Sequence, residues 1–346
     1  MKHILLTLLG LILISSCQPE DDSVPFENDA FGIHVLGKFD TEHRNGRYYH
    51  SINGVEQTLP QELQSHLRQE NSETFIATPS IHISSDGTLT YYVSDFYREG
   101  VDKVYRYTNG NKENLEQLAG CKLKSAITHG STLPFGSCST ESSAREYEYR
   151  NFYITDSGEI TFLNDLPKEN DIYSLQKDNN GNIHTLSLSS TSYQYNYYVN
   201  GELIKSDSYK MQAIALGESG AEIHLSNEVL QTGNTRLPKT YLPENSVLKS
   251  IKTTNNQVFE VGYLEGAKKN IEGSFYAHNG NVTELYDEHQ TFWMNNGIIK
   301  DSQSHIVGQM LSKHTGQWSS IYLIDGKWQP SSGIIGLSLT DILYVD

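Results

Sequence analysis

Residues 173–201 read YSLQKDNNGNIHTLSLSSTSYQYNYYVNG, and this stretch sets out the local structure on which the fold is built. The runs 173–177 and 183–188 are rich in residues that favour strands, and Asp178-Asn179-Asn180-Gly181 between them is a turn sequence. A third, aromatic run ends at Asn200-Gly201, a dipeptide that favours the left-handed backbone of a two-residue hairpin turn. The stretch therefore predicts short antiparallel strands joined by tight turns.

The same unit recurs along the chain. Asn-Gly or Asp-Gly occurs nine times, at Asn45, Asn53, Asp86, Asn109, Asn180, Asn200, Asn279, Asn296 and Asp325. The turn glycines that follow aromatic strands are Gly54, Gly110, Gly158, Gly201, Gly280 and Gly326. Their successive spacings are 56, 48, 43, 79 and 46 residues. We interpret the spacing of 79 as two steps, with a copy that has lost its glycine at residues 240–245. The ladder then holds seven units with a period near 45.

Four short strands in each period of this length are typical of a β-propeller blade. The sequence therefore predicts an all-β chain, a β-propeller of seven four-stranded blades, with six or eight blades as alternatives. A solenoid of parallel strands is the rival architecture, but its repeats are shorter and need no tight antiparallel turns.

The two ends of the chain look like the two halves of one blade. Residues 32–37 resemble a second strand without its first, and residues 337–345 resemble the missing first strand. Pairing them would close the ring and remove an exposed sheet edge. We therefore expect residues 31–346 to form a single propeller domain, which we expect to be monomeric.

The N-terminus has the features of a secretion signal. A short basic start precedes the apolar run Ile4–Ile14, which is too short to span a bilayer. The run ends in Ser15-Ser16-Cys17, and this arrangement resembles the lipobox of bacterial lipoproteins. The resemblance implies a signal peptide over residues 1–16, which is removed, and acylation of Cys17. An ordinary signal peptide with an incidental cysteine is the alternative.

An acidic segment follows the cysteine. Residues 17–30 include Glu20-Asp21-Asp22 and predict a hydrated, flexible tether. The acidic tract also resembles the signal that places some Gram-negative lipoproteins on the exterior of the outer membrane. The expected location is therefore the outer membrane, facing outward, with the periplasmic face as the alternative. Membrane contact is expected through the lipid anchor only, because no later segment has 18 consecutive apolar residues.

The charge of the chain excludes two classes of partner. Its 42 acidic and 26 basic side chains give a formal net charge of −16. Nucleic-acid binding requires a basic surface that neutralises phosphates, so we expect no nucleic-acid partner. Electrostatic docking on anionic lipid is excluded for the same reason.

The two remaining cysteines, Cys121 and Cys138, are expected to form a disulfide. An oxidising envelope permits the bond, and the residues between them read as an irregular loop that a cross-link would stabilise. Free thiols and a metal pair are the alternatives, although two cysteines without CxxC spacing make a poor zinc site.

Five histidines recur at one position of the repeat: His34, His82, His184, His224 and His305. A ring of imidazoles around a channel would be a metal or proton site. The favoured interpretation is packing and hydrogen bonding inside the blades, because His184 shares a strand face with Leu186 and Leu188, and Phe259 occupies the position in another unit. We assign no catalytic residue, metal or cofactor, since no nucleophile elbow, HExxH or phosphate loop is present.

Two functions remain open. The favoured one is a non-enzymatic binding or scaffolding module of the cell envelope, for a glycan, a peptide or a partner protein. The alternative is an envelope polysaccharide lyase or hydrolase that uses His and Tyr in the propeller funnel. Aromatic residues crowd two regions, and these could form a glycan-binding face or pack between blades. They are Tyr193, Tyr195, Tyr197, Tyr198, Trp293, Trp318 and Trp328.

The lipoprotein interpretation predicts the chemistry of the mature N-terminus. Mass spectrometry of protein purified from membranes should find a chain that starts at Cys17 and carries acyl groups. More than one acyl chain is expected, because a single chain gives only marginal membrane binding. An unacylated N-terminus beyond Cys17 would contradict the prediction.

Overall fold

The structure is a computed structural model. It describes residues 31–39, 47–60, 63, 74–76, 79–97, 103–141, 147–217, 220–225, 228–230, 236–244, 246–254, 257–264, 273–329 and 332–345. The expected signal peptide and tether, with Cys17, lie outside these residues. No helix in this part of the chain is long and apolar enough to cross a bilayer.

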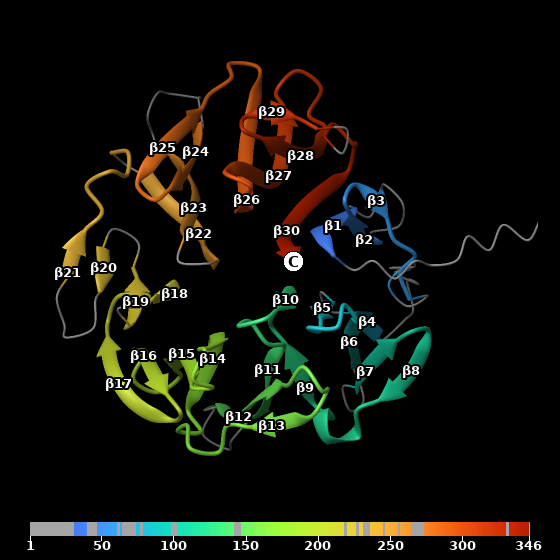
Figure 1. Cartoon of the computed structure of the whole chain (residues 1–346), viewed down its shortest axis with the longest axis vertical. Helices are drawn as coiled ribbons and strands as arrows, with labels where there is room; N and C mark the ends of the chain where they lie inside the picture. The colour runs from blue at the N-terminus through green and yellow to red at the C-terminus, as the bar shows by residue number, and fades with distance from the viewer. Residues whose placement is uncertain are drawn as a thin grey trace, which may run out of the picture.

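The described strands pair into seven sheets arranged around a common axis (Figure 1). Sheet A contains β30 (Leu337–Val345), β1 (Gly32–Phe39), β2 (Tyr48–Ile52) and β3 (Val55–Glu56). Sheet B contains β10 (Ile127–His129), β4 (Thr74–Ile76), β5 (Ser80–Ile83), β6 (Leu89–Tyr97), β7 (Lys103–Thr108) and β8 (Asn111–Asn114). Sheet C contains β9 (Cys121–Leu123), β11 (Phe135–Glu141), β12 (Tyr147–Ile154) and β13 (Ile160–Phe162).

The remaining four sheets each follow the chain without interruption. Sheet D contains β14 (Asn170–Lys177), β15 (Ile183–Ser189), β16 (Tyr195–Val199) and β17 (Glu202–Asp207). Sheet E contains β18 (Ala213–Gly217), β19 (Gly220–His224), β20 (Glu228–Leu230) and β21 (Arg236–Pro238). Sheet F contains β22 (Ser246–Thr254), β23 (Gln257–Leu264), β24 (Gly273–His278) and β25 (Asn281–Leu285). Sheet G contains β26 (Gln290–Lys300), β27 (Gln303–Ser312), β28 (Trp318–Ile324) and β29 (Lys327–Trp328). The all-β propeller predicted from the sequence is confirmed.

The Asn-Gly turns explain why the repeat is readable in the sequence. Asn53, Asn109, Asn200, Asn279 and Asp325 have φ between 46° and 50°, and the glycine after each also has positive φ. This is the backbone of a tight hairpin turn. In four sheets the turn side chain also accepts a hydrogen bond from the first or second amide of the second strand, as Asn200 Oδ1 does from Ile183 N at 2.8 Å. The side chain thus joins two hairpins of one sheet, which a glycine could not do.

The copy placed at residues 240–245 is wrong. The third and fourth strands of sheet E are β20 and β21, and residues 239–244 instead connect sheet E to sheet F. There, Lys239 Nζ donates to Glu260 Oε1 at 2.6 Å and to Leu225 O at 2.8 Å, and Tyr241 Oη donates to Glu260 Oε2 at 2.7 Å. The Lys239 and Glu260 side chains are 1% and 2% exposed. The segment resembles a hairpin in sequence, but its role is to fill the seam between sheets E and F.

The ring closes through the two ends of the chain, as predicted. β1 pairs antiparallel with β30 from Gly32 opposite Val345 to Phe39 opposite Leu337. Neighbouring sheets contact one another around the ring. Both ends of the chain are therefore held by the same ladder of hydrogen bonds.

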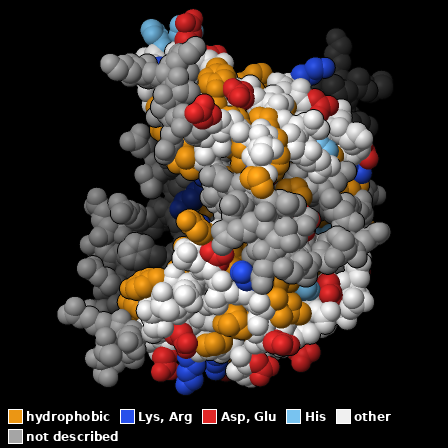
Figure 2. Space-filling model, turned by 90° about the vertical axis from the view of Figure 1, so that its left-hand side faces the viewer, with side chains coloured by type: hydrophobic (Ala, Val, Ile, Leu, Met, Phe, Trp, Pro, Cys, Tyr) orange, Lys and Arg blue, Asp and Glu red, His pale blue; other side chains and the backbone are white. Residues whose placement is uncertain are grey.

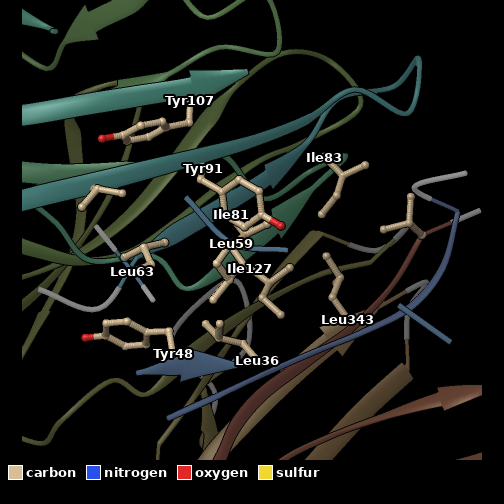
Figure 3. Packing of buried hydrophobic residues seen from close by; sticks show 12 residues of the cluster. Leu36, Tyr48, Leu59, Leu63, Ile81, Ile83, Tyr91, Tyr107, Ile127 and Leu343 are labelled. Carbon is tan, nitrogen blue, oxygen red and sulfur yellow. The ribbon is translucent and has the colours of Figure 1, made fainter. Parts of the chain in front are cut away.

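A crossing strand, β10, strengthens this closure. The chain leaves sheet C after β9, pairs β10 parallel to β5 of sheet B, and returns to sheet C as β11. Ile127 of β10 packs between Leu36 and Leu343 of sheet A and Ile81 of sheet B (Figure 3). Its amide N donates to Asp341 Oδ2 of β30 at 3.3 Å. One short strand therefore connects three sheets.

A disulfide joins the two strands from which this crossing segment departs. Cys121 and Cys138 are bonded and lie opposite each other in the β9–β11 pair, which confirms the predicted bridge. The bond closes the base of the excursion that carries β10. It therefore restricts a segment whose ordering would otherwise cost conformational entropy.

The innermost strands share a bulge. Tyr173, Lys249, Asn295 and Thr340 are each skipped by the pairing between the first and second strands of their sheets. In sheet G the bulge brings backbone so close that a Cβ at Gly308 would lie 2.1 Å from Trp293 O. Glycine is required there by this contact rather than by a turn.

The crossing strand gives the disulfide a measurable role. Replacing Cys121 and Cys138 together by alanine should lower the free energy of unfolding by about 3 kcal/mol, the entropic value for a loop of this length. Urea unfolding of the variant and the wild type measures the difference. Reduced wild-type protein should match the variant, and an unchanged urea midpoint would show that the bond does not hold β10.

Candidate functional site

A polar cleft lies between sheets B and C and has a volume of about 640 Å³. It is lined by the β5–β6 turn, the β7–β8 turn and the β12–β13 turn, so it opens at the end of the ring where these turns lie. Its charged side chains are His82, Asp86, Arg106, Glu113 and Asp156. Hydroxyl and amide side chains of serine, threonine and asparagine make up most of the rest.

His82 lies at the inner wall of the cleft. Its ring is almost fully buried, with Nδ1 3.0 Å from Thr128 Oγ1 of the crossing strand β10. Its Nε2 lies 3.1 Å from Asp156 Oδ1, which belongs to the neighbouring sheet. Three segments that are far apart in the sequence therefore meet at one imidazole.

The hydrogen bonds define which nitrogen of His82 can take up a proton. Thr128 Oγ1 donates to Ile81 O at 3.2 Å, so it accepts from His82 Nδ1–H. A proton that the ring takes up therefore lies on Nε2, from which it is donated to Asp156 Oδ1. Burial lowers the pKa of His82, and the nearby Asp156 carboxylate opposes that shift. The side chain of Asp156 is 45% exposed, so a ligand reaches the pair through this carboxylate.

Arg106 forms the opposite wall. Its Nε donates to Glu113 Oε2 at 3.0 Å, a second guanidinium nitrogen contacts the same oxygen, and a third donates to Gly158 O at 3.1 Å. The last contact joins β7 of sheet B to the β12–β13 turn of sheet C. The guanidinium thus holds the two sides of the cleft at a fixed separation.

Asp86 lies at the rim. The Ser84 hydroxyl and the Thr88 amide donate to its Oδ1 and lower its pKa to about 2. The contacts that fix Asp86, Glu113 and Asp156 each use one carboxylate oxygen. The cleft is therefore preorganised and rich in hydrogen-bond acceptors.

The repeated histidines do not share one position, contrary to the sequence interpretation. His34, His184, His224 and His305 lie on the second strands of sheets A, D, E and G. His82 instead lies on β5, opposite Thr90 of the second strand β6. The histidine of the cleft is therefore the one that departs from the repeat.

The second-strand histidines support the packing interpretation. His184 Nδ1 lies 2.7 Å from Tyr197 Oη, and His305 Nδ1 lies 3.1 Å from Tyr322 Oη. In sheet F the corresponding rings are Phe259 and Tyr276, stacked with centroids 5.9 Å apart. All of these rings are buried. The shared element is thus an aromatic contact between the second and third strands.

His34 belongs to a longer chain of buried groups. Its Nδ1 lies 3.0 Å from His50 Nε2, and His50 Nδ1 lies 2.9 Å from Tyr91 Oη of sheet B. Burial lowers the pKa of His50 well below its usual value, and the neighbouring His34 lowers it further. These imidazoles connect two sheets in the core, away from the cleft.

Three of the cleft residues could not be identified from the sequence. Arg106, Glu113 and Asp156 were assigned no role, because nothing in one sequence brings β7, β8 and the β12–β13 turn together. One signal existed, since Asp156 stands in the single repeat whose turn has an extra residue. Within the described ranges no three His, Cys, Asp or Glu residues are grouped to hold a metal ion.

The aromatic residues divide into two groups. Tyr197 and Tyr198 are buried, and Trp293 and Trp318 lie against each other with ring centroids 4.6 Å apart. Trp328 is 48% exposed and Tyr193 is 75% exposed. The packing interpretation therefore holds for some of them but not for Tyr193.

No protein-family model matches the chain, and no curated protein matches its sequence. Among solved structures it is similar to one from a study of two prolyl endopeptidases, with a TM-score of 0.50 and 10% identity, covering 88% of this chain and 52% of that one. The chain thus spans about half the length of that endopeptidase. The likeness is one of fold.

Two further structures are less similar. One is a protein of unknown function from Bacteroides caccae, with a TM-score of 0.42 and 12% identity, covering 75% of this chain and 94% of that one. The other is the β-propeller domain of the Trilobed protease from Pyrococcus furiosus, with a TM-score of 0.35 and 8% identity, covering 80% of this chain and all of that one.

His224 should make the protein less stable in acid. Burial, and then the charge of Lys239, lower its pKa to about 3. The unfolded chain binds this proton near pH 6.5 and the folded chain only near pH 3, so stability is lost as pH falls below about 6.5. At pH 5 the loss from this group is about 2 kcal/mol relative to pH 7.5.

Replacing His224 by phenylalanine, the residue that sheet F has on its second strand, should remove that part of the pH dependence. Urea unfolding of wild type and variant at pH 7.5 and pH 5 measures it. Equal pH dependence in the two proteins would show that His224 is not the titrating group.

Proposed function

We propose that this protein is a cell-envelope lipoprotein that acts as a binding module and takes its ligand in the cleft between sheets B and C. The observation that carries the proposal is the cleft itself, a space of about 640 Å³ whose hydrogen-bonding groups are already held in place. A ligand that binds a preorganised site loses less free energy to ordering side chains.

The lining indicates the chemistry of the ligand. Carboxylates outnumber cations, and hydroxyl and amide side chains surround them. A ligand with several hydrogen-bond donors, such as the hydroxyl groups of a glycan or the N–H groups of a peptide, is complementary to such a surface. An anionic ligand is disfavoured because Arg106, the one arginine or lysine that lines the cleft, is already paired with Glu113.

The same geometry favours one alternative function. His82 Nε2 faces Asp156 across 3.1 Å, and burial favours the neutral imidazole. The exposed Asp156 carboxylate can take a proton from a ligand and share it with His82 Nε2, so the pair could act as an acid–base group. The alternative is therefore an envelope polysaccharide lyase or hydrolase that uses the His82–Asp156 pair.

The location completes the proposal. We take Cys17 as the lipid attachment site, the acidic residues 17–30 as a tether, and the outer membrane facing outward as the place of action. We take each of the seven sheets as one blade of a monomeric propeller. Acidic side chains are spread over the upper and lower parts of the face in Figure 2, which suits a surface that repels anionic lipid.

A screen of the full-length protein against a glycan array and a peptide library tests the cleft. Binding of a hit, measured by calorimetry, should weaken at least tenfold in Asp156→Ala, because this change removes the exposed acceptor. The matched control is Asp165→Ala, an exposed aspartate outside the cleft, which should bind as the wild type does.

The same ligand separates the two functions. A binding module leaves the ligand intact in wild type and in His82→Gln. Release of reducing ends or of unsaturated sugars, abolished by His82→Gln, would establish the enzyme and reject the binding module. A ligand that binds equally to Asp156→Ala and wild type would place the site elsewhere.

A further inference from the structure

Tyrosine side chains gather at the end of sheets C and D that lies away from the cleft. Tyr147 begins β12, whereas the cleft residue Asp156 follows its last residue, Ile154. Eight residues of extended strand separate the two ends by roughly 25 Å. We call Tyr147, Tyr149, Tyr193 and Tyr209 the tyrosine face.

The four residues belong to segments that meet at this end. Tyr147 and Tyr149 lie on the same side of β12, with ring centroids 6.4 Å apart. Ser190 Oγ, in the turn that carries Tyr193, donates to Tyr147 O at 3.4 Å. Tyr209 follows β17, whose last residue Asp207 pairs with Tyr195 just after the same turn.

The rings of Tyr193, Tyr209 and Tyr147 are exposed, whereas tyrosines of the core are buried. Tyr193 is 75%, Tyr209 65% and Tyr147 46% exposed. Their neighbours Tyr197 and Tyr198, on the same hairpin, are each 4% exposed. On this hairpin, Tyr197 and Tyr198 thus stabilise the core, whereas Tyr193 contributes little to it.

The backbone of Tyr193 is the strongest sign that its ring has a separate role. Its φ is 54°, in the left-handed region. The other described non-glycine residues with positive φ are asparagine, aspartate or serine. A bulky side chain is disfavoured in this conformation, whereas asparagine tolerates it. The fold alone would favour a different residue here, which indicates a role for the ring other than core packing.

Two close pairs of opposite charge lie beside the face. Lys168 Nζ lies 3.5 Å from Glu148 Oε2, and Lys124 Nζ contacts Asp171, which also accepts from Ser137. Burial, and then the charge of Asp171, raise the pKa of Tyr149, so its phenol stays a hydrogen-bond donor. The face therefore offers aromatic rings and hydroxyl groups without an excess of either charge.

We propose that the tyrosine face binds a neutral glycan. The apolar C–H side of a pyranose ring would lie on the exposed tyrosine rings, and its hydroxyl groups would reach the phenols, Ser190 and the paired side chains. An anionic polysaccharide would have to compete with Glu148 and Asp171 for their paired lysines. The proposal is independent of the cleft.

Calorimetry of the full-length protein with maltohexaose, cellohexaose, xylohexaose, mannohexaose and laminarihexaose tests the proposal. At least one should bind, and Tyr193→Asn should weaken it at least tenfold. The same variant should unfold at an equal or higher temperature than wild type, because asparagine suits the backbone. Tyr147→Ala should also weaken binding. Tyr286→Ala, an exposed tyrosine of another sheet, should not.

Three results would overturn the proposal. One is that none of the five oligosaccharides binds, and another is that Tyr193→Asn and Tyr147→Ala bind as tightly as wild type. The third is self-association that Tyr193→Asn abolishes, which would identify the face as a protein interface. His82→Gln should leave this affinity unchanged, so a failure here is distinguishable from a failure of the cleft proposal.

Discussion

The pairing of β1 with β30 is the interaction on which the rest of the structure depends. Without it, the first and last sheets would each expose unpaired backbone groups, and the apolar faces of β1 and β30 would lose their neighbours. The ladder from Gly32 to Phe39 satisfies these groups with residues about 300 positions away. The crossing strand β10 adds to the same junction, because it pairs with sheet B, packs on sheet A and hydrogen-bonds to β30 through Asp341. Closure is therefore shared between two strands, and the disulfide supports one of them.

Both proposed sites are consequences of this ring. The cleft exists because sheets B and C diverge at one end while Arg106 holds them together, and its histidine is oriented by Thr128 of the crossing strand. The tyrosine face forms where β12 extends past the start of β14. Asn151 is buried against Asn170 of β14, whereas Tyr149 and Tyr147, on the same side of β12, lie beyond that contact. The core fixes the strands, and the sites use the parts of the strands and turns that extend past it. This division is typical of folds that support binding through their turns.

The repeat could be predicted because its signals are local. Each Asn-Gly turn, each alternating strand and each half-blade is encoded by a few neighbouring residues. The pairing of Cys121 with Cys138 could also be predicted, because one short loop separates them. The failures concern contacts between distant segments. Residues 240–244 resembled part of a hairpin but follow Lys239, which forms a buried ion pair with Glu260 between sheets E and F, and His82 resembled a repeated histidine but lies on a different strand. The contact of Asp156 with His82 and the parallel pairing of β10 could not be predicted, since both depend on how neighbouring sheets meet.

The position of β30 has a further consequence for how the chain reaches its folded state. The strand that completes the ring, β30, is synthesised about 300 residues after β1, the strand with which it pairs. Until then sheet A lacks its innermost strand, and Ile127 and the β10 amide lack their partners on β30. The ring can therefore close only once β30 is available. Because the pairing of β1 with β30 joins residues so far apart in the sequence, we expect it to be a late step in folding.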